Sequence, residues 1–328
     1  RKGEDPAPFM KYVFFDIECA CVYKSVAKIC VFGYVVADEA FRVLEREDIL
    51  LNPRGKFHLT DRKGREGLVL PYVYEDFKKY PAFPAAYARI KALLENKDHV
   101  VLGHATLNDV NYLNLETRPY KLPSLRFSYY DTQFFYMNVK HNFSRQLGLG
   151  AMAEELGVEF TPHRAVDDAY ATMRVCEALL KSESLLTVAD FVSRYQIRAG
   201  RISDYKISPL ASQGLKTYLA ERDEERDRRA KAHDEFYRYV NKHMHRRAKG
   251  GTLEGKVFCF SKEVEEEVPL SVRLVAAIFA SGGKYTSHPS ECNVYIARGQ
   301  GGVRYQNAVS AGASYVPLES LEHALQEI

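Results

Sequence analysis

The first part of the chain contains three segments with the character of β-strands, of which the first two are apolar. They cover residues 12–18, 26–37 and 41–51, and short polar connections such as Asp38-Glu39 separate them. Strands that follow one another through such short connections usually pair as antiparallel neighbours. The pattern therefore predicts a three-stranded antiparallel meander.

Beyond Pro71 the apolar spacing changes between that of helices and that of strands. Helices are predicted at 74–94, 107–116, 132–139, 145–156 and 164–181, and strands at 99–103 and 128–131. Antiparallel strands followed by alternating parallel strands and helices describe an α/β layer fold with a mixed sheet. We therefore expect a ribonuclease H-like mixed sheet with flanking helices.

Residues 183–250 have a different character. The stretch 219–247 carries charges of both signs three and four residues apart, which is typical of a solvated helix. Its basic end, 242–249, is followed by Gly250-Gly251. We interpret 183–250 as a charged helical connector. Two interpretations of its charge remain open: a solvated face, which is favoured, or contacts to nucleic-acid phosphates.

After the two glycines a compact pattern begins afresh. Strands are predicted at 253–260, 293–297 and 314–317, and helices at 271–281, 304–311 and 319–327. The pattern describes a small βαββαβα unit. The predicted organisation is thus 1–182, 183–250 and 251–328, in agreement with the two domains that a length of 328 residues suggests.

The formal net charge of +3 is unevenly distributed. Residues 1–182 carry 25 basic and 24 acidic residues, residues 183–250 carry 15 and 10, and residues 251–328 carry 6 and 9. Six cysteines without a disulfide framework or zinc spacing favour a reducing, cytoplasmic location. The longest apolar stretch, 29–37, is nine residues long, so no membrane-spanning helix is expected. The chain begins with Arg1, which leaves its native N-terminus and any targeting segment open.

Two carboxylates, Asp16 and Glu18, interrupt the first apolar strand. Residues i and i+2 of a strand point to the same face, so these side chains project side by side. Two neighbouring anions at the edge of a core repel each other and destabilise the fold unless a cation neutralises them. Mg²⁺ prefers such oxygen ligands. The alternative is that both carboxylates reach water at a strand end.

Two further segments carry candidate chemistry. Asp109 lies in the first turn of the helix that follows the strand 99–103, where it faces a crevice or caps the helix. His163 precedes the helix that contains Asp167 and Asp168. A histidine there is a suitable general base, because its reference pKa of about 6.5 lies close to working pH, or it is an ordinary surface residue.

In combination these motifs are far more specific than any one of them. Over roughly residues 9–182 the sequence resembles the DEDDh family of 3′–5′ exonucleases, which contains the proofreading epsilon subunit of bacterial DNA polymerase III, RNase T and oligoribonuclease. The matching motifs are Phe15-Asp-Ile-Glu18, Gly103-His104 with Asp109 five residues on, Asp131-Thr132, Leu156-Gly157 and His163-Arg-Ala-Val-Asp-Asp168-Ala.

The resemblance implies a two-metal mechanism for hydrolysis of phosphodiester bonds. Two divalent ions, Mg²⁺ or Mn²⁺, would be held by four carboxylates, and His163 would accept a proton from the attacking water. The four implied metal ligands are Asp16, Glu18, Asp109 and Asp168. The His-x4-Asp spacing selects Asp168, with Asp167 as the fallback, and a structural role is expected for Asp131.

The sequence departs from the family pattern at two places. Cys19-Ala20-Cys21 replaces the usual Thr-Thr-Gly, whose groups meet the terminal nucleotide, and Ala105 and Asn108 replace the usual Asn and Phe. These changes put the nucleotide contacts and the substrate in doubt, but they remove no metal ligand.

Residues 251–328 resemble a BRCT domain in three features. These are Leu253-Glu-Gly-Lys-Val-Phe-Cys-Phe-Ser261, Gly282-Gly283 after an apolar helix, and 308–312 ahead of a strand. The resemblance implies a protein-interaction module. Ser261 matches the phosphate-binding Ser or Thr of phosphopeptide-binding relatives, and Arg304 is an approximate match for their Lys. The alternative is an interaction module that uses another surface. Lys262 replaces the usual glycine, and the tryptophan common in the last helix is missing.

The sequence as a whole indicates a metal-dependent 3′–5′ exonuclease joined to an interaction module. Single-stranded DNA is the favoured substrate, because BRCT modules occur mostly in genome-maintenance proteins such as those of DNA repair. An exoribonuclease that acts on RNA is the first alternative. A non-catalytic scaffold that binds nucleic-acid ends is the alternative of another class.

Overall fold

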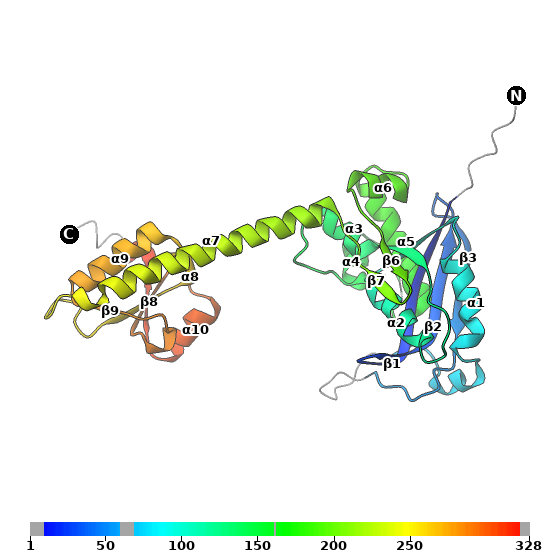
Figure 1. Cartoon of the computed structure of the whole chain (residues 1–328), viewed down its shortest axis with the longest axis horizontal. Coiled ribbons are helices and arrows are strands. Elements are labelled where there is room, and N and C mark those ends of the chain that lie inside the picture. Colours follow the sequence, from blue (N-terminus) through cyan, green and yellow to red (C-terminus); the bar gives the residue numbers. More distant parts are fainter. Residues whose placement is uncertain (1–9, 60–68, 161, 322–328) are drawn as a thin grey trace, which may run out of the picture. The chain divides into compact units, whose positions relative to one another are not determined.

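The computed structural model describes residues 10–59, 69–160 and 162–321 (Figure 1). The contacts divide the chain into two compact units, Arg1–Leu219 and Ala220–Ile328. Each unit has its own sheet and its own hydrophobic core. None of the described helices is both long and apolar enough to cross a membrane.

The first unit is built on a seven-stranded sheet of order β3-β2-β1-β4-β5-β6-β7. The strands are β1 (Lys11–Tyr23), β2 (Val26–Ala37), β3 (Val43–Leu50), β4 (His99–Gly103), β5 (Phe127–Asp131), β6 (Gly200–Ser203) and β7 (Lys206–Ser208). The first three strands pair as the predicted antiparallel meander, and β4 and β5 continue the sheet in parallel with β1. The predicted mixed sheet is confirmed.

Helices cover both faces of this sheet. They are η1 (Tyr74–Lys79), α1 (Phe83–Leu94), α2 (Leu107–Thr117), α3 (Thr132–Val139), α4 (Leu149–Glu155), α5 (Ala165–Ser182) and α6 (Val188–Arg194). Along β1, Val13 and Phe15 pack with α1 and α2, whereas Tyr12 and Phe14 pack with α3, α4 and α5. Because both faces of β1 are buried, its sequence is a continuous apolar run rather than an alternating one.

The predicted helix at 74–94 is wrong as a single element. It is divided into the 3-10 helix η1 and the α-helix α1, and Tyr80 between them has an extended backbone. Proline disfavours helical backbone in the residue before it, and Pro81 follows Tyr80. Pro84, in contrast, lies in the first turn of α1, where the missing N–H costs nothing. The predicted helix at 145–156 is also shorter and begins at Leu149.

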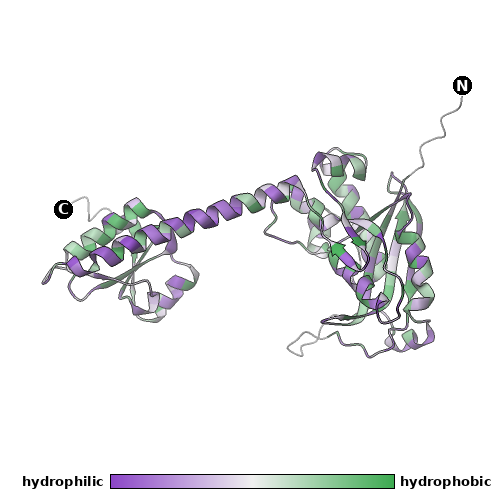
Figure 2. Ribbon diagram, in the orientation of Figure 1, coloured by the Kyte–Doolittle hydropathy of each residue, from purple (hydrophilic) through white to green (hydrophobic). Residues whose placement is uncertain are grey.

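The predicted connector contains a β-hairpin that the sequence did not indicate. Strands β6 and β7 extend the large sheet, and Ile202 of β6 is fully buried in its core. The turn residues Asp204 and Tyr205 both have positive φ, the geometry of the tight turns that suit hairpins. The hairpin precedes the long helix α7 (Gln213–His243), whose middle is strongly hydrophilic (Figure 2). The long charged helix of the predicted connector is therefore α7, and the shorter α6 also lies within the predicted bounds.

The second unit contains a four-stranded parallel sheet of order β11-β10-β8-β9. Its elements are β8 (Val257–Phe260), α8 (Lys262–Glu266), α9 (Val268–Ala280), β9 (Lys284–Tyr285), η3 (Pro289–Glu291), β10 (Val294–Ala297), α10 (Gly302–Ser310) and β11 (Ser314–Pro317). Phe236 and Val240 of α7 belong to its core. The predicted helix at 319–327 lies mostly outside the described residues, and the BRCT-like character of the unit stays a prediction.

Candidate active site

A cavity of about 320 Å³ opens in the first unit, next to the carboxyl end of β4. It brings together side chains from β1, α2, α5 and the segments that precede the two helices. Its walls contain all five residues that the sequence singled out: Asp16, Glu18, Asp109, His163 and Asp168. The residues fall between positions 16 and 168 in sequence, so only the tertiary structure could bring them together.

Strand β1 presents Asp16 and Glu18 on the same face. Asp16 lies opposite Gly33 of β2, Glu18 lies opposite Val31, and a β-bulge follows directly after Glu18. Bulges bend a strand and re-aim its side chains, and they are frequent beside functional sites. Glu18 is only 9% exposed. The alternative that both carboxylates simply reach water does not hold for Glu18, whereas Asp16 is partly exposed.

The turn before α2 places Asp109, and Asp131 holds that turn. The Asp131 carboxylate accepts hydrogen bonds from the backbone N–H groups of Ala105 (3.1 Å) and Thr106 (2.9 Å). It also caps α3 by accepting from the N–H of Gln133 at 2.8 Å. Ala105 has a positive φ, which is strained for a residue with a side chain and is common at functional sites. Asp131 thus holds the turn before α2 and the start of α3 in place, and it does not line the cavity.

His163 and Asp168 are coupled at the start of α5. The backbone N–H of His163 donates to Asp168 Oδ2 at 2.9 Å. One potential ligand atom from each of Glu18, His163 and Asp168 lies within 4.8 Å of the others. Asp167, the fallback ligand, instead faces Arg46 (3.8 Å) and Arg164 (3.9 Å) and is not part of the cavity wall.

The first turn of α5 is capped from another strand. Asp48 of β3 accepts a hydrogen bond from the N–H of Val166 at 2.8 Å. The hydroxyl of Tyr72 accepts from the N–H of Ala165 at 3.2 Å and donates to Asp48 at 3.0 Å. Arg164, the N-cap residue, has no side-chain capping bond of its own, so these two groups satisfy orphan donors of the helix. Sequence reasoning missed both, because Asp48 lies in a polar edge strand 118 residues before Val166.

Gly33 explains how closely α5 approaches the sheet. In the antiparallel register Gly33 lies between Asp16 of β1 and Asp48 of β3. A Cβ at Gly33 would lie 2.2 Å from the carbonyl carbon of Ala165, so only glycine leaves room for the start of α5. The helix that carries Asp168 therefore rests on bare backbone directly beside Asp16.

Burial and mutual repulsion raise the pKa values of the cavity carboxyls. Burial, with repulsion from Asp168 and Asp48, raises the pKa of Asp16 to about 8. Burial, with repulsion from Asp16, raises the pKa of Glu18 to about 9. The pKa of Asp168 rises to about 7, and that of Asp109 lies well above its ordinary value, in both cases chiefly through burial.

This electrostatic arrangement fits a bound divalent cation. None of the described residues that line the cavity is a lysine or an arginine, so no permanently charged side chain offsets the four carboxylates there. Clustered carboxylates with raised pKa values are what a hard cation would relieve, and Mg²⁺ and Mn²⁺ take oxygen ligands of this kind. The residues present therefore fit the metal chemistry that the sequence implied.

His104 has a different role from His163. Its ring lies within hydrogen-bond distance of Thr132 Oγ1 (3.0 Å) and of the carbonyl oxygen of Leu147 (3.1 Å). Burial lowers the pKa of His104 to about 4, so the ring is neutral at physiological pH. His104 therefore links β4 to α3 and the loop before α4, whereas His163 is exposed at the mouth of the cavity.

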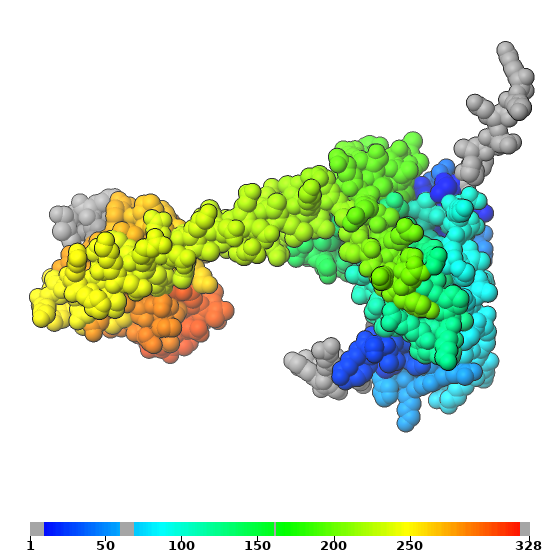
Figure 3. Space-filling view, viewed as in Figure 1, coloured from blue at the N-terminus to red at the C-terminus, as the bar shows by residue number. Residues whose placement is uncertain are grey.

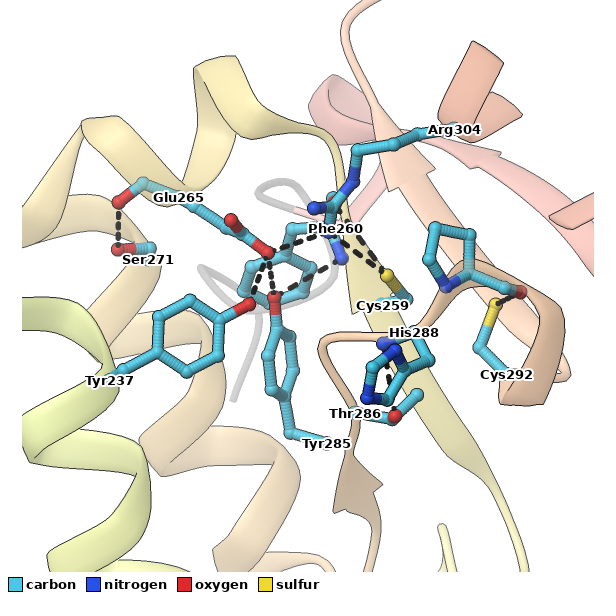
Figure 4. Close-up of polar contacts among 11 residues, drawn as sticks. Tyr237, Cys259, Phe260, Glu265, Ser271, Tyr285, Thr286, His288, Cys292 and Arg304 are labelled. Atoms are coloured by element: carbon cyan, nitrogen blue, oxygen red, sulfur yellow. Dashed lines mark hydrogen bonds and ion pairs between the residues drawn. The ribbon is translucent and has the colours of Figure 1, made fainter. Parts of the chain in front are cut away.

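The second predicted pair, Ser261 and Arg304, lies in the other unit, and Figure 4 shows the polar contacts of Arg304. Arg304 donates to Glu265 Oε1 at 2.8 Å and to the carbonyl oxygen of Phe260 at 2.9 Å. The same Glu265 oxygen accepts from the hydroxyl of Tyr285 at 2.8 Å. The guanidinium charge is thus already paired inside the unit, and Ser261 Oγ is buried without a partner among the described residues. Phosphate binding by this pair stays a prediction.

Comparison with known proteins identifies a family for the first part of the chain. A family model described as RNase_T, exonuclease, matches residues 13–176, which is half of the chain. The chain therefore belongs to this exonuclease family. No curated protein matches the chain.

Solved structures with a similar fold include three exonucleases. One, described as a 3′-exonuclease that recognises the histone mRNA stem-loop at its 3′ end, has 13% identity and a TM-score of 0.47 over 62% of this chain and 70% of that one. The nuclease domain of 3′hExo, a DEDDh family member bound to rAMP, has 15% identity and a TM-score of 0.44 over 56% and 97%. Exonuclease I of E. coli with a dA16 oligonucleotide has 18% identity and a TM-score of 0.43 over 56% and 42%. Because these scores lie below 0.5, family membership rests on the family model.

Proposed function

We propose that the chain is a metal-dependent 3′–5′ exonuclease that hydrolyses phosphodiester bonds at the 3′ end of nucleic acid. One observation carries the proposal: four carboxylates and one exposed histidine converge on a single cavity that has no lysine or arginine in its described walls. A site built only to bind a polyanion would need positive charge there, whereas this one is acidic. Acidic groups can bind a phosphate only through cations that lie between them and the phosphate.

The residues of the cavity divide into two roles. Asp16, Glu18, Asp109 and Asp168 would hold two divalent ions, which would supply charge stabilisation for the phosphate and the leaving oxygen. His163 would accept the proton of the attacking water on a ring nitrogen, as general base. Its backbone N–H donates to Asp168, which holds the backbone of His163 beside the carboxylates.

Single-stranded DNA is the proposed substrate, and RNA is the alternative. The preference for DNA rests on the BRCT-like character of the second unit and therefore on analogy. The cavity itself fits either polymer, because its acidic groups would act on the phosphodiester that both share. The second unit is proposed to bind a protein partner.

One experiment tests the activity and separates the candidates. The full chain is incubated with 5′-labelled single-stranded DNA, duplex DNA and RNA, with Mg²⁺ or Mn²⁺ and then with chelator. We expect products that shorten from the 3′ end with either metal, and none with chelator. Asp16→Asn and His163→Gln should abolish them, whereas Asp167→Asn is the matched control, because Asp167 is a neighbouring acid outside the cavity.

Each outcome has a defined meaning. Relative rates on DNA and RNA decide the substrate. Products that survive Asp16→Asn would place catalysis elsewhere. A protein that binds 3′ ends but yields no products on any substrate with either metal would be a scaffold, and the proposal would be wrong.

A further inference from the structure

The two edges of the sheet in the second unit differ in charge. All four strands are parallel, so their amino ends lie together on one side of the sheet, which we call the amino edge. Their carboxyl ends lie together on the opposite side, the carboxyl edge. Beyond the carboxyl edge lies α8 with three glutamates, and Glu267 follows directly after it. Two of the cations at this edge are paired, Arg304 with Glu265 at 2.8 Å and Arg298 with Glu267 at 2.6 Å, and the exposed Lys262 lies among the glutamates at the start of α8.

The opposite, amino edge gathers cations from three separate segments. Lys256 directly precedes β8 and Lys284 begins β9, and the N–H of Lys284 donates to the carbonyl oxygen of Lys256 at 2.9 Å. The basic segment 242–249 begins in the last turn of α7 and continues through the 3-10 helix η2 (Met244–Arg246). The chain from its end onward is bound to the same edge through backbone hydrogen bonds. The N–H of Ala248 donates to Phe279 at 2.9 Å, and that of Leu253 donates to Ser281 at 2.8 Å.

We define the amino-edge cluster by the six cations of these segments. They are Lys242, Arg246, Arg247, Lys249, Lys256 and Lys284. All six are exposed, and none forms an ion pair with any residue of the described ranges. Glu254 is the one acidic residue between 236 and 256, and there is none between 268 and 290. The end of α7 and the turn after it lie at the surface of the unit, in yellow in Figure 3.

The middle of α7 provides a contrast within the same helix. Three of the arginines there are paired with acids three or four residues away: Arg226 with Asp223 at 3.2 Å, and Arg228 and Arg229 with Glu225 at 2.7 Å. The two halves of the charged segment therefore differ. The middle is a self-neutralised solvated face, whereas the end is a concentration of uncompensated positive charge.

Stabilisation of helix ends does not account for the cluster. Cations in the last turn of a helix interact favourably with its dipole, and this explains Lys242 at the end of α7. The effect fades within one turn, so it does not reach Lys249 or Lys256. At the end of α9 the carbonyl oxygens of Phe279 and Ser281 are already satisfied by backbone N–H groups. The cationic side chains are therefore left for an external partner.

We propose that the amino-edge cluster binds the phosphate backbone of the nucleic-acid substrate. The choice of this polyanion rests on the proposed function, because a chain that cuts nucleic acid must hold it. Exposed cations without acidic neighbours release counterions from phosphates and bind without regard to sequence. The cluster lies in the second unit, so it would contribute to affinity for long strands and not to the chemistry. It is also distinct from Ser261 and Arg304, which lie at the carboxyl edge.

Two triple variants of the full chain test the proposal. The first, Arg246→Gln with Arg247→Gln and Lys249→Gln, removes three unpaired cations. The matched control, Arg226→Gln with Arg228→Gln and Arg229→Gln, removes the same charge from the paired middle of α7. Binding to labelled single-stranded DNA of about 30 nucleotides is measured with chelator present, between 50 and 200 mM salt, which is where phosphate contacts dominate.

The first variant should bind about tenfold more weakly at 50 mM salt. The slope of log affinity against log salt should fall in magnitude by about 2, since each phosphate contact on a single strand contributes about 0.7. The control should change the slope by less than half as much. Equal effects of the two variants, or no effect of the first, would overturn the proposal. A first variant that loses binding to anionic lipid vesicles but keeps its binding to DNA would also overturn it.

A second readout separates this proposal from the proposed function. Hydrolysis of a dinucleotide, whose single phosphodiester leaves no further phosphate for the cluster to bind, should be unchanged in the first variant. Hydrolysis of the long strand should show a raised KM. Absence of hydrolysis in the unmodified chain would refute the proposed function and leave the binding result intact. Normal hydrolysis with an unaltered salt slope would refute the cluster alone.

Discussion

The capping of α5 by Asp48 makes a quantitative prediction about the site. Asp48→Ala removes the acceptor of the Val166 N–H and a partner of the Tyr72 hydroxyl and of Arg164. Loss of a helix cap costs about 0.5 to 2 kcal/mol, and leaving partly buried donors unsatisfied costs about 1 to 3 kcal/mol. The Arg164 pair adds little because Arg164 is half exposed. We expect the free energy of unfolding to fall by about 2 kcal/mol.

The effect on catalysis should exceed the effect on stability. Asp48 holds the turn that presents His163 and Asp168, and a misplacement of about 1 Å at a reacting group costs about 100-fold in rate. We expect kcat to fall by about 10- to 100-fold in Asp48→Ala with a small change in KM. Asp48→Asn keeps an oxygen for the Val166 N–H and should recover most of the rate.

The charge of Asp48 provides a readout that a purely structural role would not move. Repulsion from Asp48 contributes to the raised pKa values of Asp16, Glu18 and Asp168. Both variants remove this charge, so both should shift the pH dependence of metal binding to lower pH. Metal binding is measured by calorimetry and unfolding by denaturant titration.

A neighbouring carboxylate on the same strand is the control. Glu47 pairs with Arg89 at the surface, so Glu47→Ala should cost less than about 1 kcal/mol and leave kcat unchanged. The reasoning is refuted if Asp48→Ala retains the stability and kcat of the unmodified chain, or if Glu47→Ala lowers kcat as much.

Three further predictions concern other parts of the molecule. The pKa values of Glu18 and Asp168, about 9 and 7, lie above the ordinary value near 4, so the fold favours their protonated forms. Their contribution to stability without metal is therefore present at about pH 4 and is lost as pH rises through 7 to 9. Added Mg²⁺ should raise Tm more at pH 8.5 than at pH 5, measured by scanning fluorimetry, and an equal increase at both would contradict this. Gly33→Ala should destabilise the first unit by about 3 kcal/mol and abolish hydrolysis, because the new Cβ would meet the start of α5. Normal activity in that variant would count against the close approach. Arg304→Met should destabilise the second unit by about 3 kcal/mol by leaving Glu265 buried without its cation, and adding Glu265→Gln should restore part of the loss in thermal unfolding.

The pattern of apolar residues determined the larger part of the fold in advance. Strands β1 and β2 are buried on both faces, so their sequences are long apolar runs that cannot be mistaken for loops. Burying charged groups such as Asp16 and Glu18 within such a run costs free energy. The sequence therefore indicated these two carboxylates as candidate site residues. Short elements were not visible: β6 and β7 are only four and three residues long, and their place in the sheet depends on pairing with β5.

The residue types and spacings of the sequence indicated the chemistry of the site. The contacts that hold the site residues in place depend on the tertiary structure. The interval between His163 and Asp168 is local, so the sequence could carry it. Asp48 caps the helix at Val166, and Gly33 leaves room for Ala165. Both contacts are between segments more than 100 residues apart in the sequence. No local propensity reports such contacts, because they exist only after the sheet and helix have packed.

The charge of the second unit shows the same division between sequence and structure. The sequence determined that residues 251–328 carry a net charge of −3 and that a basic segment precedes them. Only the parallel sheet decided that the acids lie beyond one edge while Lys256 and Lys284 join the basic segment at the other. A net charge sums over positions in the chain, whereas a partner responds to the charges that the fold brings side by side.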